Sequence, residues 1–516
     1  MTTVDIPDPM NAADLFVDEN LRRGREGKVA VYYQDREITY ARVGELVNRT
    51  GNGLRELGVR MEERVMLLLV DCPEFVYAFF GAIKIGAVPV PVNTMLKPHD
   101  YEYLVNDSRG RVLVVSEALL AQIEPVRSRL RYVRHIVVVG RTGQPRDTGF
   151  EDMVRAASAE LDPEPMSKDD PCFWLYSSGT TGFPKGAVHL QHDMVYCAEL
   201  FGKQVLGLTE MDRTFSVAKL FFAYGLGNSL YFPFRVGAST VLYPGKPDPV
   251  VHFETIERRR PTVFFAVPTA YAAMLALPDA ERKYDTSSLR LCVSAGEMLP
   301  AALWERWQER FGTEILDGIG STEVLHIFIS NRPGRCKAGS SGELVPGYDA
   351  RIVDSDGAPV PRGQVGDLLV KGESTCALYW NQHAKTKSTM EGDWIRTGDK
   401  YIRDEDGYFW YQGRSDDMLK VGGIWVSPVE IESALVAHPA VLECGVVGAE
   451  DADQLVKPKA YVVLKSGHPD SAETARELQA FVRERLAAYK YPRWVEFVSE
   501  LPKTATGKIQ RFKLRT

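Results

Sequence analysis

Residues 176–186 (YSSGTTGFPKG) combine the side chains in this sequence whose chemistry is easiest to recognise. They follow the bulky run 173–176, which predicts a strand that leads into a loop. The glycines permit sharp turns and close approach to a ligand, and the hydroxyls and backbone N–H groups can donate to phosphate oxygens. Lys185 adds a compact positive charge. The segment predicts a polyphosphate-binding loop, with a flexible surface loop as the alternative. It is not a Walker A loop, because Gly186 follows Lys185 and the glycine spacing differs.

Two further segments place a carboxylate on a turn. Residues 317–323 (DGIGSTE) follow a strand-like run and suit a turn where backbone meets a flat ligand and Glu323 meets a metal. Residues 396–399 (RTGD) offer a carboxylate that suits two ribose hydroxyls. A plain turn and a simple acidic turn are the respective alternatives.

The C-terminal part holds more segments that combine charge with flexible backbone. Residues 413–417 (GRSDD) and 420–423 (KVGG) could serve a ligand or a hinge, or could be solvated loops. Residues 502–508 (PKTATGK) place Lys508 on a Gly/Thr loop near the chain end, where a lone lysine is usually just solvated.

The elements that must position these segments alternate in the first half of the chain. The predicted elements are a helix capped by Thr39 that ends near Gly58, a strand over 65–70, a helix from about 73 to 85, and a strand over 87–92. This alternation is typical of a parallel sheet with helices on both faces. Residues 140–171 are rich in Gly, Pro and charge, and we expect them to loop across the surface.

After about Arg414 the pattern changes. Ser427, Pro428 and Glu430 predict a capping-box start for a helix. Strands are expected over 442–447, 460–464 and 494–498, with a helix from about 471. About 100 residues with their own amphipathic elements can form a small separate α+β domain.

Length and composition bound the class of protein. A chain of 516 residues should hold at least two domains, and 45% hydrophobic and 25% charged residues are ordinary for a soluble enzyme. The net charge of −7 argues against a nucleic-acid partner. We find no membrane-length apolar run, signal peptide or peroxisomal ending. The seven cysteines are scattered and lack the spacing of a metal-binding motif, so the simplest interpretation is that they are reduced thiols of a cytoplasmic protein.

Taken in order, these motifs resemble the acyl-adenylate-forming superfamily, which includes acyl-CoA synthetases, luciferases and adenylation domains of peptide synthetases. YSSGTTGFPKG, GIGSTE, RTGD, GRSDD and PKTATGK all occur in the family's order, and the resemblance covers nearly the whole chain. It is closest to the benzoate–CoA ligase branch, through residues 219–228 (KLFFAYGLGN) and 317–328 (DGIGSTEVLHIF).

The resemblance implies an α/β fold with two domains. Residues 1–414 would form a large domain of stacked mixed and parallel sheets with flanking helices, and 415–516 a small mobile α+β lid that turns about Asp416. It also implies two half-reactions. A carboxylate first attacks the α-phosphate of Mg-ATP and releases pyrophosphate, and the thiol of coenzyme A then displaces AMP. Adenylation is needed because a free carboxylate has only oxide to expel.

The family's roles carry over to matching residues. Lys508 would bridge the substrate carboxylate and the α-phosphate, Glu323 would hold Mg²⁺, and Thr322 would touch the α-phosphate. The other expected ATP contacts are Ser177, Ser178, Gly179, Thr180, Thr181, Gly182 and Lys185 at the β- and γ-phosphates, Asp399 and Arg414 at the ribose, and Gly296, Glu297, Asp317 and Gly318 around the adenine. After the lid turns, Gly422 and Gly423 would line the coenzyme A tunnel.

The expected acid pocket consists of Ala223, Tyr224, Gly320, His326 and Ile327. The small residues would admit a flat ring, and Tyr224 and Ile327 would pack against it. His326 is a ligand contact or a satisfied core histidine, and the alternative for Phe221, Phe222 and Tyr224 is that they are core aromatics. Phe222 stands where many ligases of the superfamily have histidine, so it can keep a gating role but cannot form that residue's hydrogen bond.

The sequence therefore predicts an ATP- and Mg²⁺-dependent aromatic acid–CoA ligase, with benzoate as substrate, acting as a monomer or homodimer. Alternatives are a ligase for a hydroxy- or aminobenzoate, an adenylation enzyme that loads a carrier protein, and a non-catalytic nucleotide-binding protein on this fold. Retention of Glu323, Asp399 and Lys508 argues against the last.

Overall fold

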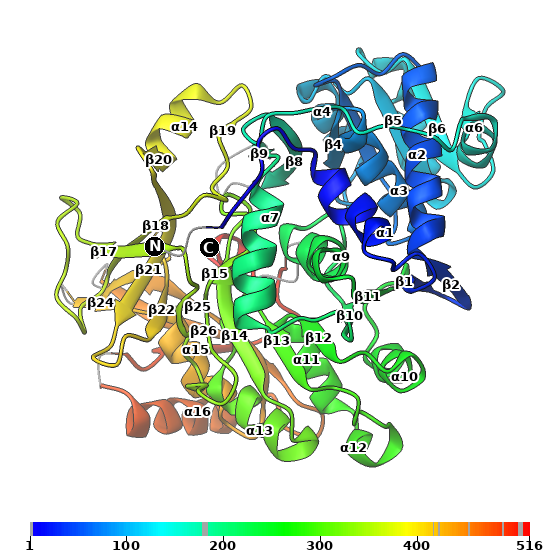
Figure 1. Ribbon diagram of the computed structural model, residues 1–516. Coiled ribbons are helices and arrows are strands. Elements are labelled where there is room, and N and C mark those ends of the chain that lie inside the picture. Colours follow the sequence, from blue (N-terminus) through cyan, green and yellow to red (C-terminus); the bar gives the residue numbers. More distant parts are fainter. Residues whose placement is uncertain are drawn as a thin grey trace.

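The computed structural model describes residues 4–177, 184–415, 417–421, 424–451, 455–487, 490–503 and 509–515. The N-terminal residues (blue to cyan) form one lobe, the central residues (green) pack beside it, and the yellow to red residues lie on the opposite side (Figure 1). All seven cysteines fall within the described residues, and each is a free thiol, as predicted. In the described ranges, every helix is too short or too polar to span a lipid bilayer.

The N-terminal lobe is built on a parallel sheet with both faces covered, as the alternation predicts. The sheet consists, in spatial order, of β4 (Val88–Pro91), β3 (Arg64–Leu68), β5 (Val112–Ser116), β6 (His135–Val139) and β7 (Thr148–Gly149). Successive side chains of a strand point to opposite faces. Val65 and Leu67 share a buried cluster with α2 (Tyr40–Glu56) and α3 (Pro73–Lys84), whereas Met66 and Leu68 share another with α4 (Pro98–Asp107).

Local signals place the first helices correctly, and composition misleads at one segment. The Thr39 hydroxyl accepts from the backbone N–H of Arg42 at 3.3 Å and caps α2, as predicted. The expectation of a surface loop over 140–171 is wrong, because this stretch contains β7 and the helix α6 (Phe150–Ala156). Phe150, Met153 and Val154 of α6 are buried, and this spacing is that of one helix face.

The central sheet brings the ends of its parallel strands to one edge. Its order is β16 (Glu343–Leu344), β15 (Ile327–Ser330), β14 (Ile315–Gly320), β13 (Leu291–Ser294), β12 (Val263–Ala266), β10 (Arg213–Ser216), β11 (Ser239–Leu242), β1 (Val29–Tyr33) and β2 (Arg36–Thr39). The strands from β14 to β1 run parallel, and the pairings beyond them are antiparallel. Segments that follow β10, β12, β13 and β14 therefore meet at the carboxyl edge, where open α/β sheets bind ligands.

Two antiparallel sheets flank this edge. The first is β8 (Pro171–Ser177), β9 (Lys185–Leu190) and β19 (Leu378–Tyr379), and the second is β17 (Asp349–Val353), β18 (Gly366–Lys371), β21 (Trp394–Arg403), β20 (Met390–Glu391) and β22 (Phe409–Arg414). The β8–β9 pair carries Ser177 and Lys185 opposite each other. The β21–β22 pair likewise places Asp399 opposite Arg414.

The residues after 418 have a buried cluster of their own. It joins the β23–β24 ribbon (Leu419–Val421 and Ile424–Val426), α15 (Pro428–Val436), α16 (Ala472–Arg485) and a sheet of β25 (Val441–Glu450), β26 (Val456–Leu464) and β27 (Trp494–Phe497). The Ser427 hydroxyl accepts from the N–H of Glu430 at 3.2 Å, which is one half of the predicted capping box. The Glu430 carboxylate accepts from Lys490 at 2.6 Å.

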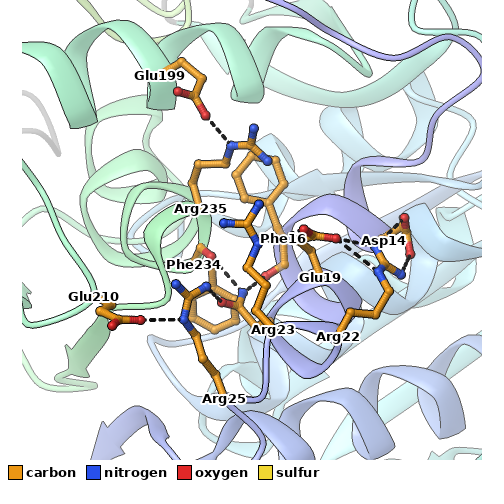
Figure 2. Close-up of polar contacts among 11 residues, drawn as sticks. Asp14, Phe16, Glu19, Arg22, Arg23, Arg25, Glu199, Glu210, Phe234 and Arg235 are labelled. Atoms are coloured by element: carbon orange, nitrogen blue, oxygen red, sulfur yellow. Dashed lines mark hydrogen bonds and ion pairs between the residues drawn. The ribbon is translucent and has the colours of Figure 1, made fainter.

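An ion pair and a hydrogen bond tie the N-terminal residues 14–25 to the central part of the chain. Arg25 binds Glu210 at 2.8 Å, and beside it Arg235 binds Glu199 at 2.7 Å (Figure 2). The buried Asn20 donates to the carbonyl of Phe234 at 2.8 Å. The start of the chain is thus held against the segments that precede β10 and β11 of the central sheet.

Candidate active site

A cavity of about 2020 Å³ opens at the carboxyl edge of the central sheet. It lies between the two flanking antiparallel sheets and the C-terminal residues. The predicted site residues that line it are Ser177, Lys185, Gly296, Glu297, Asp317, Gly318, Gly320, Thr322, Glu323, Asp399 and Arg414. Residues 178–182, Asp416, Gly422, Gly423 and Lys508 lie outside the described residues.

The Glu323 carboxylate is held where three elements converge. Its Oε1 atom accepts from the Ser177 hydroxyl at 3.0 Å and from the Tyr379 hydroxyl at 2.8 Å. The Lys185 ammonium lies 4.5 Å from the centre of the Tyr379 ring. Burial lowers the pKa of Lys185, and the nearby Glu323 opposes that effect. A cation and an anion thus face one cavity wall, as a Mg-polyphosphate requires.

Glu323 also fits a magnesium ion. The described residues include no group of three or more His, Cys, Asp or Glu side chains placed to hold a metal. Magnesium in nucleotide sites is usually held by one or two carboxylates together with substrate phosphates and water. The Glu323 carboxylate, with the Lys185 ammonium on the same cavity wall, suits that coordination.

The Asp399 carboxylate is oriented by its neighbour across the strand pair. Arg414 Nη1 lies 3.0 Å from Asp399 Oδ1 and also donates to the carbonyl of Thr397 at 3.1 Å. Gly398 has φ of +77°, and a Cβ there would lie 2.7 Å from Arg414 Nη2. Glycine adopts this positive φ without strain, and the turn brings the carboxylate and the guanidinium to the cavity wall.

Asp317 is a buried carboxyl group at the end of β14. Its Oδ2 atom accepts from the N–H of Leu299 at 3.3 Å. Burial raises the pKa of Asp317 from 3.8 to about 8. Beside it, a Cβ at Gly318 would lie 2.7 Å from the carbonyl oxygen of Ile329, so the pairing of β14 with β15 by itself requires glycine there.

Replacement of Asp317 with Asn should flatten the dependence of stability on pH. The folded state keeps a proton that the unfolded state releases above a pKa of 3.8, so stability falls as pH rises from 3.8 to about 8. This fall in the free energy of unfolding is about 1.4 kcal/mol for each pH unit and reaches a few kcal/mol in total. Asparagine mimics the neutral acid, so the variant should not lose this stability as the pH rises. Denaturant unfolding of the original protein and of D317N at about pH 6 and about pH 8 measures this change in the free energy of unfolding. An unaltered pH slope in D317N would contradict the assignment.

The expected acid-pocket residues divide between the cavity wall and the layer behind it. Gly320 lines the cavity, whereas Ala223, Tyr224, His326 and Ile327 are not among the described residues that line it. Phe222, the expected gating residue, also lines the cavity. The Tyr224 hydroxyl donates to the carbonyl of Val293 at 3.1 Å.

His326 has the contacts of a core histidine. Its Nε2 atom lies 3.2 Å from both the Tyr224 carbonyl and the Asn228 side-chain oxygen. Burial lowers the pKa of His326 to about 3, so the ring is neutral near pH 7. Its ring packs edge-on against Phe232, with centroids 4.5 Å apart.

A buried ion pair fixes the loop that carries Phe222. Asp71 Oδ1 accepts from the N–H of Leu220 at 3.0 Å, and Lys219 lies 3.8 Å from Asp71 Oδ2. Burial raises the pKa of Asp71 to about 6, against the opposing charge of Lys219. Sequence analysis missed Asp71 and also Tyr379, since neither stands in a motif and both act through segments that are distant in sequence.

The C-terminal residues complete the cavity wall. Lys503, Ile509, Gln510 and Arg511, which flank 504–508 on both sides, line it. Arg511 Nη2 lies 2.6 Å from Glu432 of α15, and its Nη1 lies 3.5 Å from Asp417. Lys503 binds Glu443 of β25 at 2.6 Å. Both flanks are therefore anchored to the C-terminal cluster.

An α/β fold with a cavity at the carboxyl ends of its strands is typical of proteins that bind nucleotides. Residues 17–380 match the family model for AMP-binding enzymes, and residues 430–508 match the model for the C-terminal domain of AMP-binding enzymes. The chain therefore belongs to the AMP-binding enzyme family.

Known relatives match along the whole chain. The benzoate–CoA ligase of Thauera aromatica is 50% identical over 516 residues, which cover 99% of this chain and 97% of the relative. The crystal structure of the anthranilate CoA ligase AuaEII in complex with anthranoyl-AMP superposes on this chain with a TM-score of 0.96 and 50% sequence identity. The match covers 100% of this chain and 98% of the AuaEII chain. A benzoate CoA ligase from Burkholderia xenovorans LB400 has a TM-score of 0.91 and 45% identity, with 98% and 100% coverage. The predicted fold class and superfamily are confirmed.

Proposed function

We propose that the protein is an ATP- and Mg²⁺-dependent CoA ligase for an aromatic carboxylic acid, with benzoate as its substrate. The convergence of Lys185, Glu323 and Asp399 on one cavity carries the proposal, because it suits the phosphates, the metal and the ribose of Mg-ATP. The names of relatives that are 50% and 45% identical over nearly the whole chain support the acid and the acceptor.

In the first half-reaction, a carboxylate oxygen of the acid bonds to the α-phosphorus of ATP and pyrophosphate leaves. Lys508 neutralises the two approaching anions, and the Thr322 hydroxyl binds the α-phosphate. Lys185 and residues 177–182 bind the β- and γ-phosphates. Asp399 and Arg414 bind the ribose, and the adenine lies among Gly296, Glu297, Asp317 and Gly318. Magnesium, held by Glu323, supplies charge neutralisation on the phosphates.

In the second half-reaction, the thiol sulfur of coenzyme A bonds to the acyl carbon, the bond from that carbon to the AMP oxygen breaks with its electron pair on AMP, and the thiol proton is released to solvent. The thiol must reach the carbon that Lys508 approached, so residues 415–516 turn about Asp416 as a lid over the body 1–414. The separate buried cluster after residue 418 supports this division. Gly422 and Gly423 leave room for the pantetheine arm in the turned state.

The proposed acid pocket consists of Gly320 at the cavity wall and of Ala223, Tyr224, His326 and Ile327, which are not among the described residues that line the cavity. None of these side chains is charged at neutral pH, since burial holds His326 neutral, and this favours an uncharged ring. The anthranilate CoA ligase with 50% identity makes an aminobenzoate the second candidate. We place the reaction in the cytoplasm, catalysed by a monomer or homodimer.

A panel of acids tests the substrate. Pyrophosphate release and CoA-thioester formation are measured with benzoate, 2-aminobenzoate, 4-hydroxybenzoate, cinnamate and long-chain fatty acids. We expect benzoate to have the highest kcat/KM, by about 10-fold over the substituted rings, because each unpaired polar substituent costs about 1–3 kcal/mol in an apolar pocket. A preference for long-chain acids, or adenylation without thioester formation on CoA, would overturn the proposal.

A further inference from the structure

Thr322 and Glu323 lie on a strained turn after β14. Leu325, which ends the turn, is fully buried and has φ of +71°, in the left-handed region that a leucine rarely adopts. Such a conformation is unfavourable for a residue with a side chain and persists only where the surroundings hold it. The backbone N–H of Leu325 donates to the Thr322 carbonyl at 3.2 Å, and the N–H of Cys376 donates to the Glu323 carbonyl at 2.7 Å.

A buried histidine adds a side-chain contact to this turn. His189 Nε2 lies 2.8 Å from the carbonyl oxygen of Thr322, and since a carbonyl only accepts, the imidazole donates. His189 Nδ1 lies 2.7 Å from Asp193 Oδ2, which also accepts from the N–H of Leu190 at 3.1 Å. The side chains of His189 and Asp193 are both fully buried.

The position of His189 on β9 joins the turn to the phosphate-binding hairpin. Because side chains alternate along a strand, Lys185 and His189 share one face of β9. On the partner strand, Ser177 pairs with Lys185, and Phe173 pairs with His189. The Phe173 and His189 rings stack with centroids 5.2 Å apart and planes at 18°. The imidazole is thus fixed in orientation by one ring and one carboxylate.

We propose that His189, oriented by Asp193, is a positioning residue that holds the strained turn in the conformation that presents Glu323 to the metal. The inference rests on the proposed role of Glu323 in metal binding. Loss of the His189 donor removes the shorter of the two hydrogen bonds to the Thr322 carbonyl and leaves the 3.2 Å bond from the Leu325 N–H, so the peptide plane can rotate more easily and the adjoining Glu323 loses its alignment with Ser177 and Tyr379.

The test compares two double variants that differ only in the donor. H189Q/D193N keeps an N–H close to the Nε2 position and leaves no unpaired buried carboxylate. H189M/D193N has almost the same shape but no donor. Mn²⁺ binding in the presence of α,β-methylene-ATP, followed by electron paramagnetic resonance, reports metal affinity without catalysis. We expect the Gln/Asn variant to bind Mn²⁺ within about 3-fold of the original protein, and the Met/Asn variant about 10-fold more weakly, the scale for one buried hydrogen bond.

A second buried histidine serves as the control. His252 on α10 (Pro249–Arg259) is 2% exposed and packs against Phe215, away from the turn. H252M should lower thermal stability without changing Mn²⁺ affinity. Equal Mn²⁺ affinity in the two double variants, or a similar loss in H252M, would overturn the inference. If the original protein itself fails to bind Mn²⁺ with α,β-methylene-ATP, the proposed function fails instead.

Discussion

Replacement of Lys508 with alanine should slow benzoate-dependent pyrophosphate release about 10²- to 10³-fold, the usual scale for loss of one preorganised charge. Two anions must approach each other in adenylation, and the ammonium group offsets their repulsion. Thioester formation from presynthesised benzoyl-adenylate should be nearly unchanged, because that step proceeds after the lysine has withdrawn. Stopped-flow pyrophosphate detection and a thiol-consumption assay measure the two steps separately.

Lys513 provides a matched control for Lys508. It lies in the same terminal segment, is exposed, and has its ammonium 5.8 Å from the Phe512 ring. K513A removes an equal charge and should change neither half-reaction by more than about 2-fold, as is usual for a solvated surface charge. Equal losses of both half-reactions in K508A would contradict the two-state lid.

Replacement of Glu323 with glutamine should raise the Mg²⁺ concentration needed for half-maximal adenylation by at least about 10-fold, and lower the rate about 10²-fold at modest Mg²⁺. Glutamine can still accept from Ser177 and Tyr379, so the shape of the turn is kept and only the charge is lost. Excess Mg²⁺ should restore part of the rate. Titration of pyrophosphate release against Mg²⁺ measures both effects.

The control for Glu323 lies just before the same strand. The Glu314 carboxylate accepts from the backbone N–H of Gly334 at 2.8 Å, at the end of β14 remote from the cavity. E314Q should leave the Mg²⁺ titration unchanged. A Mg²⁺ dependence that is the same in E323Q as in the original protein would remove the metal role from Glu323.

Short-range patterns predicted most of the scaffold. Thr39 and Ser427 signal their helices because a cap acts within three residues, and both helices start where predicted. Residues 176–186 and 396–399, for which we propose phosphate and ribose binding, stand out in the sequence because each group of residues is contiguous. By contrast, α6 was hidden by the polar and Gly/Pro-rich sequence around its short buried face.

Other parts of the site depend on contacts between distant segments. Tyr379 reaches Glu323 only because β19 pairs with β9. Asp71 reaches the Phe222 loop only because β3 and β10 end close together. His189 and Asp193 are four residues apart on a strand and the helix that follows it, and nothing in that spacing names Thr322 as the acceptor. Such pairings require the packed structure.

The ion pairs of Arg511 have a mechanical consequence. Asp417 directly follows the proposed pivot, and Arg511 follows Lys508 by three residues, while Glu432 of α15 holds the same guanidinium. These contacts fix the segment that follows Lys508 to the start of the C-terminal residues and to α15. In the proposed mechanism, a rotation at residue 416 would therefore carry the segment that bears Lys508 along with the C-terminal residues, so withdrawal of the ammonium group and access for the thiol would result from the same rotation.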